Sequence, residues 1–260
     1  MLVAMTEIHI FKSIQQLAEF AVEKWAEISR SEVRNKGYVS IALSGGNTPV
    51  TFYKKLSGEK GFPWGETHVF MVDERFVPYE SDENNYHMIH RTLLRHVNIS
   101  PKHIHPIRTS GISPETAAER YEEDIISYCR TVGIQLPRFD LLLLGIGEDG
   151  HTASLFPGTP SLKETGRLAV SVYPPDPSKR GRITLTLPVI NNAQNVFFMA
   201  EGASKAKIIK EVVEDKDHML PASMVRPCDG RLFFLFDECA GSLISEKRKQ
   251  TGHSAGRLLP

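Results

Sequence analysis

The sequence predicts an α/β fold with a mostly parallel central sheet. Segments with strand patterns alternate with segments of helical spacing along the chain. This order is expected for a layered α/β fold rather than for separate all-α and all-β halves. The run FDLLLLG, which contains Leu141–Leu144, is too apolar for a strand with one face in water. It therefore predicts a central strand of a parallel sheet, covered on both sides.

The remaining elements follow in order along the chain. Apolar residues recur at helical spacing from Ile14 to Trp25, and Ser113 with Pro114 forms a cap and first-turn proline for a later helix. Helices are predicted at about 14–25, 50–56, 84–94, 115–130 and 204–214. Strands are predicted at 38–43, 68–72, 141–144, 168–172, 183–187, 196–200 and 232–236. Several of these strands are expected to lie parallel.

Length and composition predict one compact domain. The chain has 260 residues, enough for a substantial core, and neither a repeat nor a low-complexity tract is evident. We assign residues 1–245 to a single catalytic domain. The end, EKRKQTGHSAGRLLP, is basic and rich in small residues, so 246–260 are predicted to be a flexible tail.

Charge and cysteine content limit the possible partners. The 31 basic and 31 acidic residues cancel, so no global field favours nucleic acid or an anionic membrane. Three cysteines without CxxC spacing favour reduced thiols in the cytoplasm. The start lacks a signal-peptide pattern, and no window approaches 18 uninterrupted apolar residues. We expect a cytoplasmic monomer or weak homodimer whose partner is a small-molecule substrate.

The segment GIGEDGH presents His151 and Asp149 after the apolar strand. Ligands of parallel sheets bind just past the carboxyl ends of the strands, and glycines such as Gly147 allow a sharp turn and close approach to a ligand. A histidine side chain ordinarily has a pKa near 6.5, so a histidine at this position could take a proton from water near neutral pH. The alternative is a surface pair that only caps a turn. Three nearby glycines, and Thr152 and Ser154 able to begin a helix over the site, favour the functional interpretation.

The loop LSGGNTP lies between a predicted strand and a predicted helix. Amides at a helix N-terminus bind anions, so this loop is predicted to hold a phosphate. The predicted binding residues are Ser44, Gly45, Gly46, Asn47 and Thr48. Thr48 and Pro49 form a plausible cap and first-turn pair. The loop matches neither GxGxxG nor GxxxxGK[ST], so it does not indicate a dinucleotide or a nucleoside triphosphate. A plain tight turn with a helix cap is the alternative.

Charged residues follow or begin other predicted strands. Asp73, Glu74 and Arg75 end the strand at 68–72, Arg182 begins RITLTLP, and Lys205 lies near a helix start. Arginine suits a phosphate or a developing oxyanion because its planar donors bind oxygen pairs. Lysine near a helix start opposes the helix dipole unless an anion binds there. The alternative for all of these residues is a solvated surface.

The other histidines do not predict a metal site. His87, His90 and His96 lack the HExxH pattern, and His103 and His105 have no nearby acids at ligand spacing. We therefore expect neither a metal nor another cofactor.

Four blocks in this order resemble the 6-phosphogluconolactonases, hydrolases of the pentose phosphate pathway. They are LSGGNTP, DERFVP with SDENNYHMIHRTLL, FDLLLLGIGEDGHTASLFPG, and RITLTLPVINNA leading to GASKA. The resemblance implies a Rossmann-like layered sandwich, as in sugar-phosphate deaminases and isomerases, and 6-phospho-D-glucono-1,5-lactone as substrate. Glucosamine-6-phosphate deaminases are the nearest rival. They have DEY where this chain has DER, and a segment ending in glutamate and proline where this chain has TASLFP.

Taken with the resemblance, the site residues acquire roles. We expect His151, Asp149 and Arg75 to be catalytic, with His151 activating water and Asp149 orienting it or holding the turn. Substrate and phosphate binding is assigned to Ser44, Gly45, Gly46, Asn47, Thr48, Asp73, Arg75, Gly147, Arg182 and Lys205. Which of the three cations faces the phosphate and which the lactone carbonyl stays open. The alternative from another class is a sugar-phosphate sensor without catalysis. Such sensors usually carry a DNA-binding domain, and neither end of this sequence shows the helical domain or basic stripe expected of one, so the enzyme is preferred.

Overall fold

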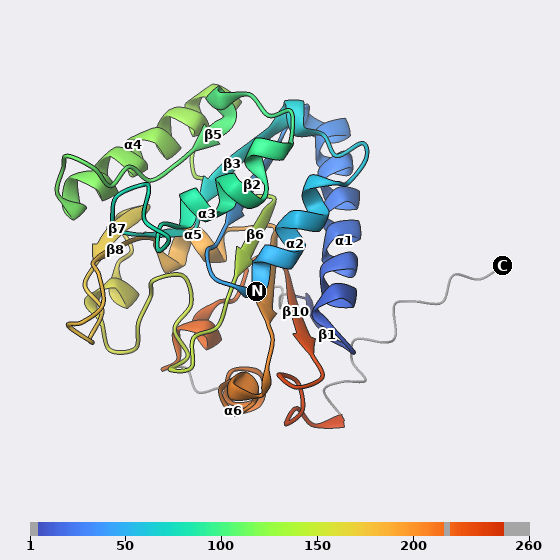
Figure 1. Cartoon of the computed structure of the whole chain (residues 1–260). Helices are drawn as coiled ribbons and strands as arrows, with labels where there is room; N and C mark the ends of the chain where they lie inside the picture. The colour runs from blue at the N-terminus through green and yellow to red at the C-terminus, as the bar shows by residue number, and fades with distance from the viewer. Residues whose placement is uncertain (1–4, 216–218, 247–260) are drawn as a thin grey trace.

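A seven-stranded parallel sheet forms the centre of the molecule (Figure 1). The computed structural model describes residues 5–215 and 219–246. The strand order is β1-β10-β9-β6-β2-β3-β5, and every neighbouring pair is parallel. The strands are β1 (Met5–Phe11), β2 (Val39–Leu43), β3 (Thr67–Met71), β5 (Ile104–His105), β6 (Leu141–Leu144), β9 (Asn195–Ala200) and β10 (Arg231–Asp237). The predicted α/β fold with a mostly parallel sheet is confirmed.

Helices cover both faces of this sheet. They are α1 (Ile14–Lys36), α2 (Thr48–Ser57), α3 (Asn85–Thr92), α4 (Pro114–Val132), α5 (Leu187–Asn191) and α6 (Ala206–Lys210). Figure 1 shows α1 and α2 on one side of the sheet and α4 on the other. On the first side the buried Trp25 ring packs edge-on against Phe52 and Phe197, at centroid distances of 5.0 and 5.9 Å. α4 begins as predicted, with the Ser113 hydroxyl accepting from the Thr116 amide.

The central strand β6 confirms the prediction from its composition. All four leucines have no exposed surface, and β6 pairs with β2 on one side and β9 on the other. The prediction succeeds because a strand that is covered on both faces carries apolar side chains on both. Its sequence is then a continuous apolar run instead of an alternation of apolar and polar residues.

A second, smaller sheet departs from the parallel arrangement. It consists of β4 (Asp73–Arg75), β8 (Arg182–Leu185) and β7 (Ala169–Val172), in the order β4-β8-β7, and both pairings are antiparallel. The strands predicted at 168–172 and 183–187 are therefore present but lie outside the parallel sheet. β8 ends at Leu185 because Pro188 lies in the first turn of α5.

Other elements differ from the predictions. The edge strand β1 was not assigned from the sequence, and no helix begins at Thr152 or Ser154. The helix predicted over 204–214 is split into a 3₁₀ turn, the short α6 and a π-helical turn. Within 5–215 and 219–246, no helix is long and apolar enough to cross a membrane. The predicted tail lies almost entirely outside these ranges.

The topology places a crevice between β2 and β6. From β2 the chain proceeds to β3 and β5 on one side, whereas β6, β9 and β10 continue on the other. Ligands of open α/β sheets bind at the carboxyl ends of the strands where the strand order reverses in this way. The loops after β2 and β6 are therefore the expected position for a site.

Candidate active site

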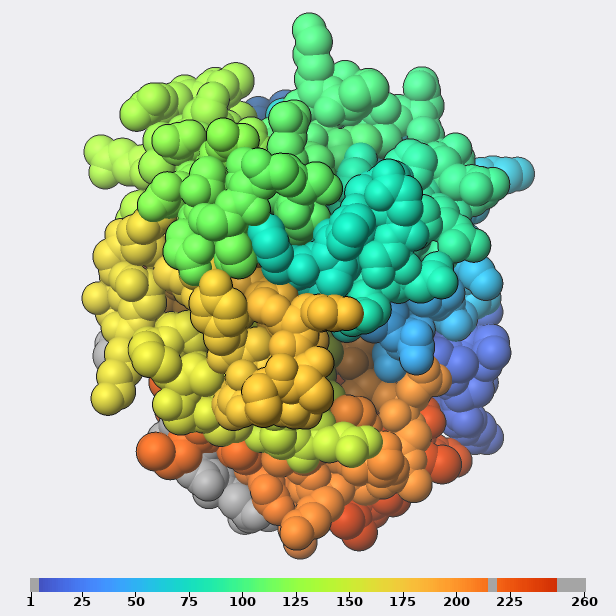
Figure 2. Space-filling view, turned by 60° about the vertical axis from the view of Figure 1, so that its left-hand side comes forward, coloured from blue at the N-terminus to red at the C-terminus, as the bar shows by residue number. Residues whose placement is uncertain are grey.

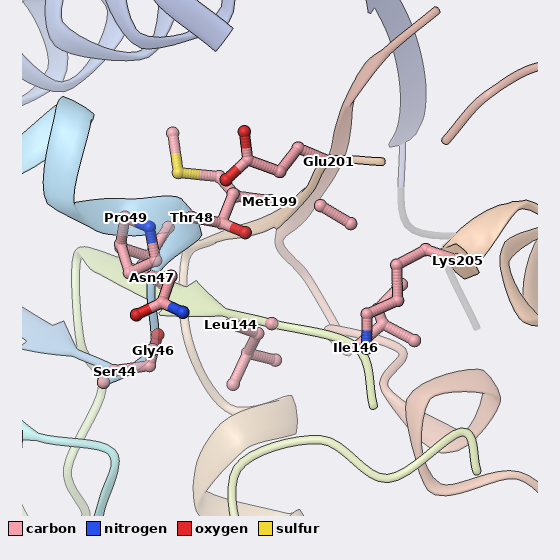
Figure 3. Close-up of a pocket in the computed structure, with 14 residues that line it drawn as sticks. Ser44, Gly46, Asn47, Thr48, Pro49, Leu144, Ile146, Met199, Glu201 and Lys205 are labelled. Atoms are coloured by element: carbon pink, nitrogen blue, oxygen red, sulfur yellow. The ribbon is translucent and has the colours of Figure 1, made fainter. Parts of the chain in front are cut away.

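A pocket of about 270 Å³ opens at the carboxyl ends of β2, β6 and β9. It is lined by Ser44–Pro49, Leu143–Ile146, Met199–Glu201 and Lys205. Figure 3 shows the side chains of Asn47 and Lys205 on opposite sides of the pocket and that of Glu201 on a third side. The pocket thus brings together the whole predicted phosphate-binding loop and one predicted cation, although Lys205 is about 157 residues further along the chain than this loop.

The loop after β2 differs in detail from its prediction. Helix α2 begins at Thr48, so Asn47, not Thr48, is the cap residue, and its side chain makes no capping bond. Pro49 lies in the first turn, as predicted. Gly46 has φ +99°, a left-handed conformation that a side chain would disfavour. Pro49 has no N–H and the Val50 amide donates to the Asn47 carbonyl at 3.1 Å, so the backbone amides that could serve an anion here are those of the pocket-lining loop up to Thr48.

Lys205 and Glu201 give the pocket opposite charges. Lys205 ends a 3₁₀ turn after β9 and forms no ion pair with the residues that the structure describes. Glu201 directly follows β9 and was not identified from the sequence. The sequence does contain a signal for Glu201, because a carboxylate that directly follows a buried parallel strand lies at the edge of the sheet where ligands bind.

The turn after β6 holds the His151 ring against the backbone. The Gly147 amide donates to the His151 carbonyl at 2.8 Å, and the Gly150 amide donates to the Gly147 carbonyl at 3.0 Å. A Cβ placed on Gly147 would lie 2.0 Å from Nδ1 of His151, so only glycine leaves room for the ring. Instead of starting a helix, Thr152 donates its hydroxyl to the Gly145 carbonyl at 2.8 Å.

Asp149 and His151 form a direct pair. Asp149 Oδ1 lies 2.5 Å from His151 Nδ1 and 3.1 Å from the His151 amide nitrogen. Partial burial pushes the pKa of Asp149 upward, but the hydrogen bond and charge of His151 outweigh it and lower that pKa. The imidazole packs against Phe156 at 4.7 Å and its side chain stays 28% exposed. With Nδ1 engaged by the carboxylate, Nε2 is the nitrogen available to a water molecule.

Arg75 and Arg182 face each other across the small sheet. They are partners in the antiparallel register of β4 and β8. Arg75 donates to the Glu83 carbonyl at 2.8 Å, and Arg182 donates to the Arg180 carbonyl at 3.3 Å. Burial, followed by the charge of Arg75, lowers the pKa of Arg182. Arg75 Nε is buried with no hydrogen-bond partner among the described residues. Two adjacent cations with neutral partners form a local site for an anion.

The two acids before Arg75 are buried, not displayed at the rim. The Glu74 carboxylate accepts from the amides of Arg75, Asn85 and Tyr86 at 2.6–2.8 Å, which caps helix α3 from a distant segment. Burial raises the pKa of Glu74 to about 7, against the opposing effect of these amides. Asp73 accepts from the Ser154 hydroxyl at 2.6 Å. Its carboxylate is therefore largely engaged by the protein.

The predicted residues form three neighbouring groups. Ser44–Thr48 and Lys205 line the pocket, whereas the other predicted residues do not. Gly147, Asp149 and His151 form the second group, and Asp73, Arg75 and Arg182 the third. Figure 2 shows a hollow bordered by the chain after β2 (blue), after β4 (teal) and after β9 (orange). The first two groups follow strands β2, β9 and β6 of the parallel sheet, and the third lies on β4 and β8 of the small sheet.

No set of three or more metal-ligating side chains arranged for an ion occurs within residues 5–215 and 219–246. The prediction that the reaction uses no metal stays a prediction.

Comparisons with known proteins show the family to which the chain belongs. The family model for glucosamine-6-phosphate isomerases/6-phosphogluconolactonase matches residues 12–234. A 6-phosphogluconolactonase from Synechocystis sp. is 39% identical, over 80% of this chain and 86% of that protein. The crystal structure of 6-phosphogluconolactonase from Thermotoga maritima is 32% identical with a TM-score of 0.78, covering 89% of this chain and 99% of the other. The Trypanosoma cruzi 6-phosphogluconolactonase is 30% identical with a TM-score of 0.82, covering 94% and 98%. The chain therefore belongs to the family of glucosamine-6-phosphate isomerases and 6-phosphogluconolactonases.

Proposed function

We propose that this chain hydrolyses 6-phospho-D-glucono-1,5-lactone to 6-phospho-D-gluconate, with His151 as the general base. The observation that carries the proposal is the Asp149–His151 pair at 2.5 Å, partly exposed at the same sheet edge as the anion pocket. Relatives at 30% identity or more carry the name of this activity. A δ-lactone is an activated ester, so a base for water and donors for the carbonyl oxygen are sufficient chemistry.

In the proposed reaction, Nε2 of His151 removes a proton from water as the water oxygen attacks C1. General-base assistance of this kind contributes about 10² to 10⁴ in rate. The tetrahedral intermediate then collapses by breaking the bond between C1 and the ring oxygen. The imidazolium returns its proton to that oxygen, and the ionised Asp149 stabilises the imidazolium while it exists.

The phosphate is assigned to the pocket lined by the loop after β2 and by Lys205. The backbone amides of the loop up to Thr48, at the N-terminal end of α2, and the Lys205 ammonium would provide the positive potential for it. This leaves Arg75 and Arg182, opposite each other on β4 and β8, for the lactone carbonyl oxygen as it becomes negative. Binding energy from the phosphate would then orient C1 toward His151.

Lactone decay measured with and without the protein at slightly acidic pH tests the proposal, since spontaneous hydrolysis is slower there. The wild type is expected to accelerate loss of the phosphorylated lactone far more than loss of unphosphorylated gluconolactone. His151→Ala should lower kcat by about 10² to 10⁴. Lys205→Ala should mainly raise KM, whereas Lys207→Ala, on the exposed side of α6, should change neither constant.

Two results would contradict the proposal. One is an unchanged kcat for His151→Ala. The other is release of ammonia from glucosamine 6-phosphate without lactone hydrolysis, which would indicate a deaminase instead. The segment Thr152–Pro157 contains no glutamate that could serve such a deaminase.

The setting of the enzyme is part of the proposal. We infer a monomer or weak homodimer in the cytoplasm, with the small-molecule substrate as its partner and no nucleic acid or membrane. The single catalytic domain is assigned to residues 1–245. Sedimentation of the purified chain tests the oligomeric state, and lactone kinetics of a variant ending at residue 245 test the domain boundary. A stable large assembly, or loss of activity in the shortened chain, would contradict these assignments.

A further inference from the structure

A chain of buried contacts joins the phosphate-binding loop to the turn that carries His151. It begins at Asn85, the first residue of α3, which is 2% exposed. A Cβ placed on Gly45 would lie 1.8 Å from Oδ1 of Asn85. Gly45 is therefore required for the Asn85 side chain to lie against the loop, and not only for approach of a ligand.

The same asparagine is bound to β4. Its Nδ2 donates to the Asp73 carbonyl at 2.9 Å and lies 3.4 Å from Asp73 Oδ1. Its backbone amide donates to Glu74 Oε1 at 2.6 Å. Bonds between buried polar groups hold their partners in one geometry, because any alternative leaves a buried donor or acceptor unpaired. Asn85 thus fixes the loop after β2 relative to the small sheet.

Asp73 extends the chain of contacts toward the catalytic turn. Its Oδ2 accepts from the hydroxyl of Ser154, which has no exposed surface, at 2.6 Å. The Ser154 amide donates to the Thr184 hydroxyl at 3.2 Å, and Thr184 lies directly opposite Asp73 in the β4–β8 register. Ser154 is therefore held by two adjacent strands of the small sheet.

Ser154 lies three residues after His151, and the backbone between them is constrained. Ala153 has φ +50°, in the left-handed region that residues with a side chain rarely adopt. Such a conformation persists only when neighbouring contacts enforce it. Thr152, bound to the Gly145 carbonyl, and Ser154, bound to Asp73, provide those contacts on either side.

We propose that Asn85 and Ser154 are positioning residues that act through Asp73 to set the separation between the phosphate-binding loop and His151. The inference rests on the proposed function, in which phosphate bound at one end orients C1 at the other. Remote binding accelerates a reaction only if this separation is held, and a displacement of 1 Å can cost about 10²-fold in rate. Neither side chain needs to touch the substrate in this role.

A double-mutant cycle on the full-length enzyme tests the link. Ser154→Ala and Asn85→Ala are each expected to lower kcat for the phosphorylated lactone about tenfold. Both substitutions break the same chain of contacts. The kcat of the double variant should therefore be no more than about threefold lower than that of whichever single variant has the lower kcat. The inhibition constant of inorganic phosphate should stay within about twofold in Ser154→Ala, since that residue lies on the catalytic side.

Ser29→Ala is the matched control, because Ser29 is also fully buried but lies on α1, away from the site. It should leave kcat unchanged at temperatures where every variant is folded. Single-variant kcat values within twofold of wild type would overturn the inference, as would a double variant with the multiplied loss of about 100-fold. A wild type that does not accelerate lactone loss would instead overturn the proposed function.

Discussion

Arg75 and Arg182 are direct partners across the antiparallel β4–β8 pair. Neither forms an ion pair with an acid in the part of the chain that the structure describes. Like charges placed opposite each other in a sheet destabilise it by about 0.2–1 kcal/mol. Two arginines in this arrangement favour an anion between them.

Replacing one of these arginines should therefore separate stability from activity. In Arg182→Gln the free energy of unfolding is expected to change by no more than about 1 kcal/mol, because the lost repulsion with Arg75 is offset by lost attraction to nearby acids, Asp73, Glu83 and Glu74. The value of kcat/KM should fall at least about tenfold, as a donor to the lactone oxygen is lost. Urea unfolding and lactone kinetics measure the two effects. Arg180→Gln, at an exposed position two residues earlier, is the control and should change neither.

Glu201 should weaken anion binding in the pocket that it shares with Lys205. In Glu201→Gln the negative charge is removed, so inorganic phosphate is expected to bind about three- to tenfold more tightly. The gain should shrink as ionic strength rises, because salt screens the interaction. Competitive inhibition by phosphate at two salt concentrations measures it. Equal or weaker inhibition would place the phosphate elsewhere. Glu238→Gln, exposed after β10, is the control.

Gly147 is expected to be required for the position of the His151 ring. An alanine Cβ would lie 2.0 Å from Nδ1 and 2.7 Å from Asp149 Oδ1, so Gly147→Ala must displace the pair. We expect kcat to fall about 10²-fold while the inhibition constant of phosphate changes little. Gly65→Ala, where a Cβ meets nothing within 4 Å, should leave kcat unchanged. A normal kcat for Gly147→Ala would mean that the ring can act from another position.

The histidines at the β3–β5 edge should make stability depend on pH. Burial, followed by the charges of His103 and His105, lowers the pKa of His68 to about 4 from 6.5. Its Nδ1 lies 3.2 Å from Nε2 of His105, whose other nitrogen faces Asp124 at 3.0 Å. The unfolded chain binds the proton more readily between these two pKa values. The contribution of His68 to stability is therefore complete above about pH 6.5 and is lost as pH falls toward 4.

Urea unfolding of His68→Gln between pH 4 and 7 measures this contribution. The variant should lose less stability than the wild type on acidification, because glutamine does not titrate. His96→Gln, at an exposed position, should retain the wild-type slope. Identical slopes for all three proteins would exclude His68 as the responsible group.

The order of elements and the two main loops were predictable from the sequence because their signals are local. The apolar run of β6, the cap and proline before α4, and the helix after the loop SGGNTP each depend on residues a few positions apart. The glycine-rich turn around Gly147 was predictable for the same reason. The structure shows, however, that the His151 ring of the same turn leaves no room for a side chain at position 147.

Where local signals were weak, the predictions failed or were incomplete. Met5–Phe11 is a partly exposed edge strand, and its alternating pattern is not strongly apolar. Thr152 and Ser154 resembled helix caps, but their hydroxyls bond to Gly145 and Asp73 instead. A side-chain oxygen satisfies a distant partner as readily as a nearby amide, so residue type alone does not choose between them.

The sequence by itself determined the α/β class and the central buried strand, and it predicts that the His151 and SGGNTP segments carry the chemistry. Only the tertiary structure decided which distant residues meet: Arg75 with Arg182, Ser154 with Asp73, and Glu201 with Lys205 around one pocket. The physical reason is that helix and strand formation is driven by neighbours along the chain. The partners of a site are instead chosen by how strands pair and layers pack, which no local pattern encodes.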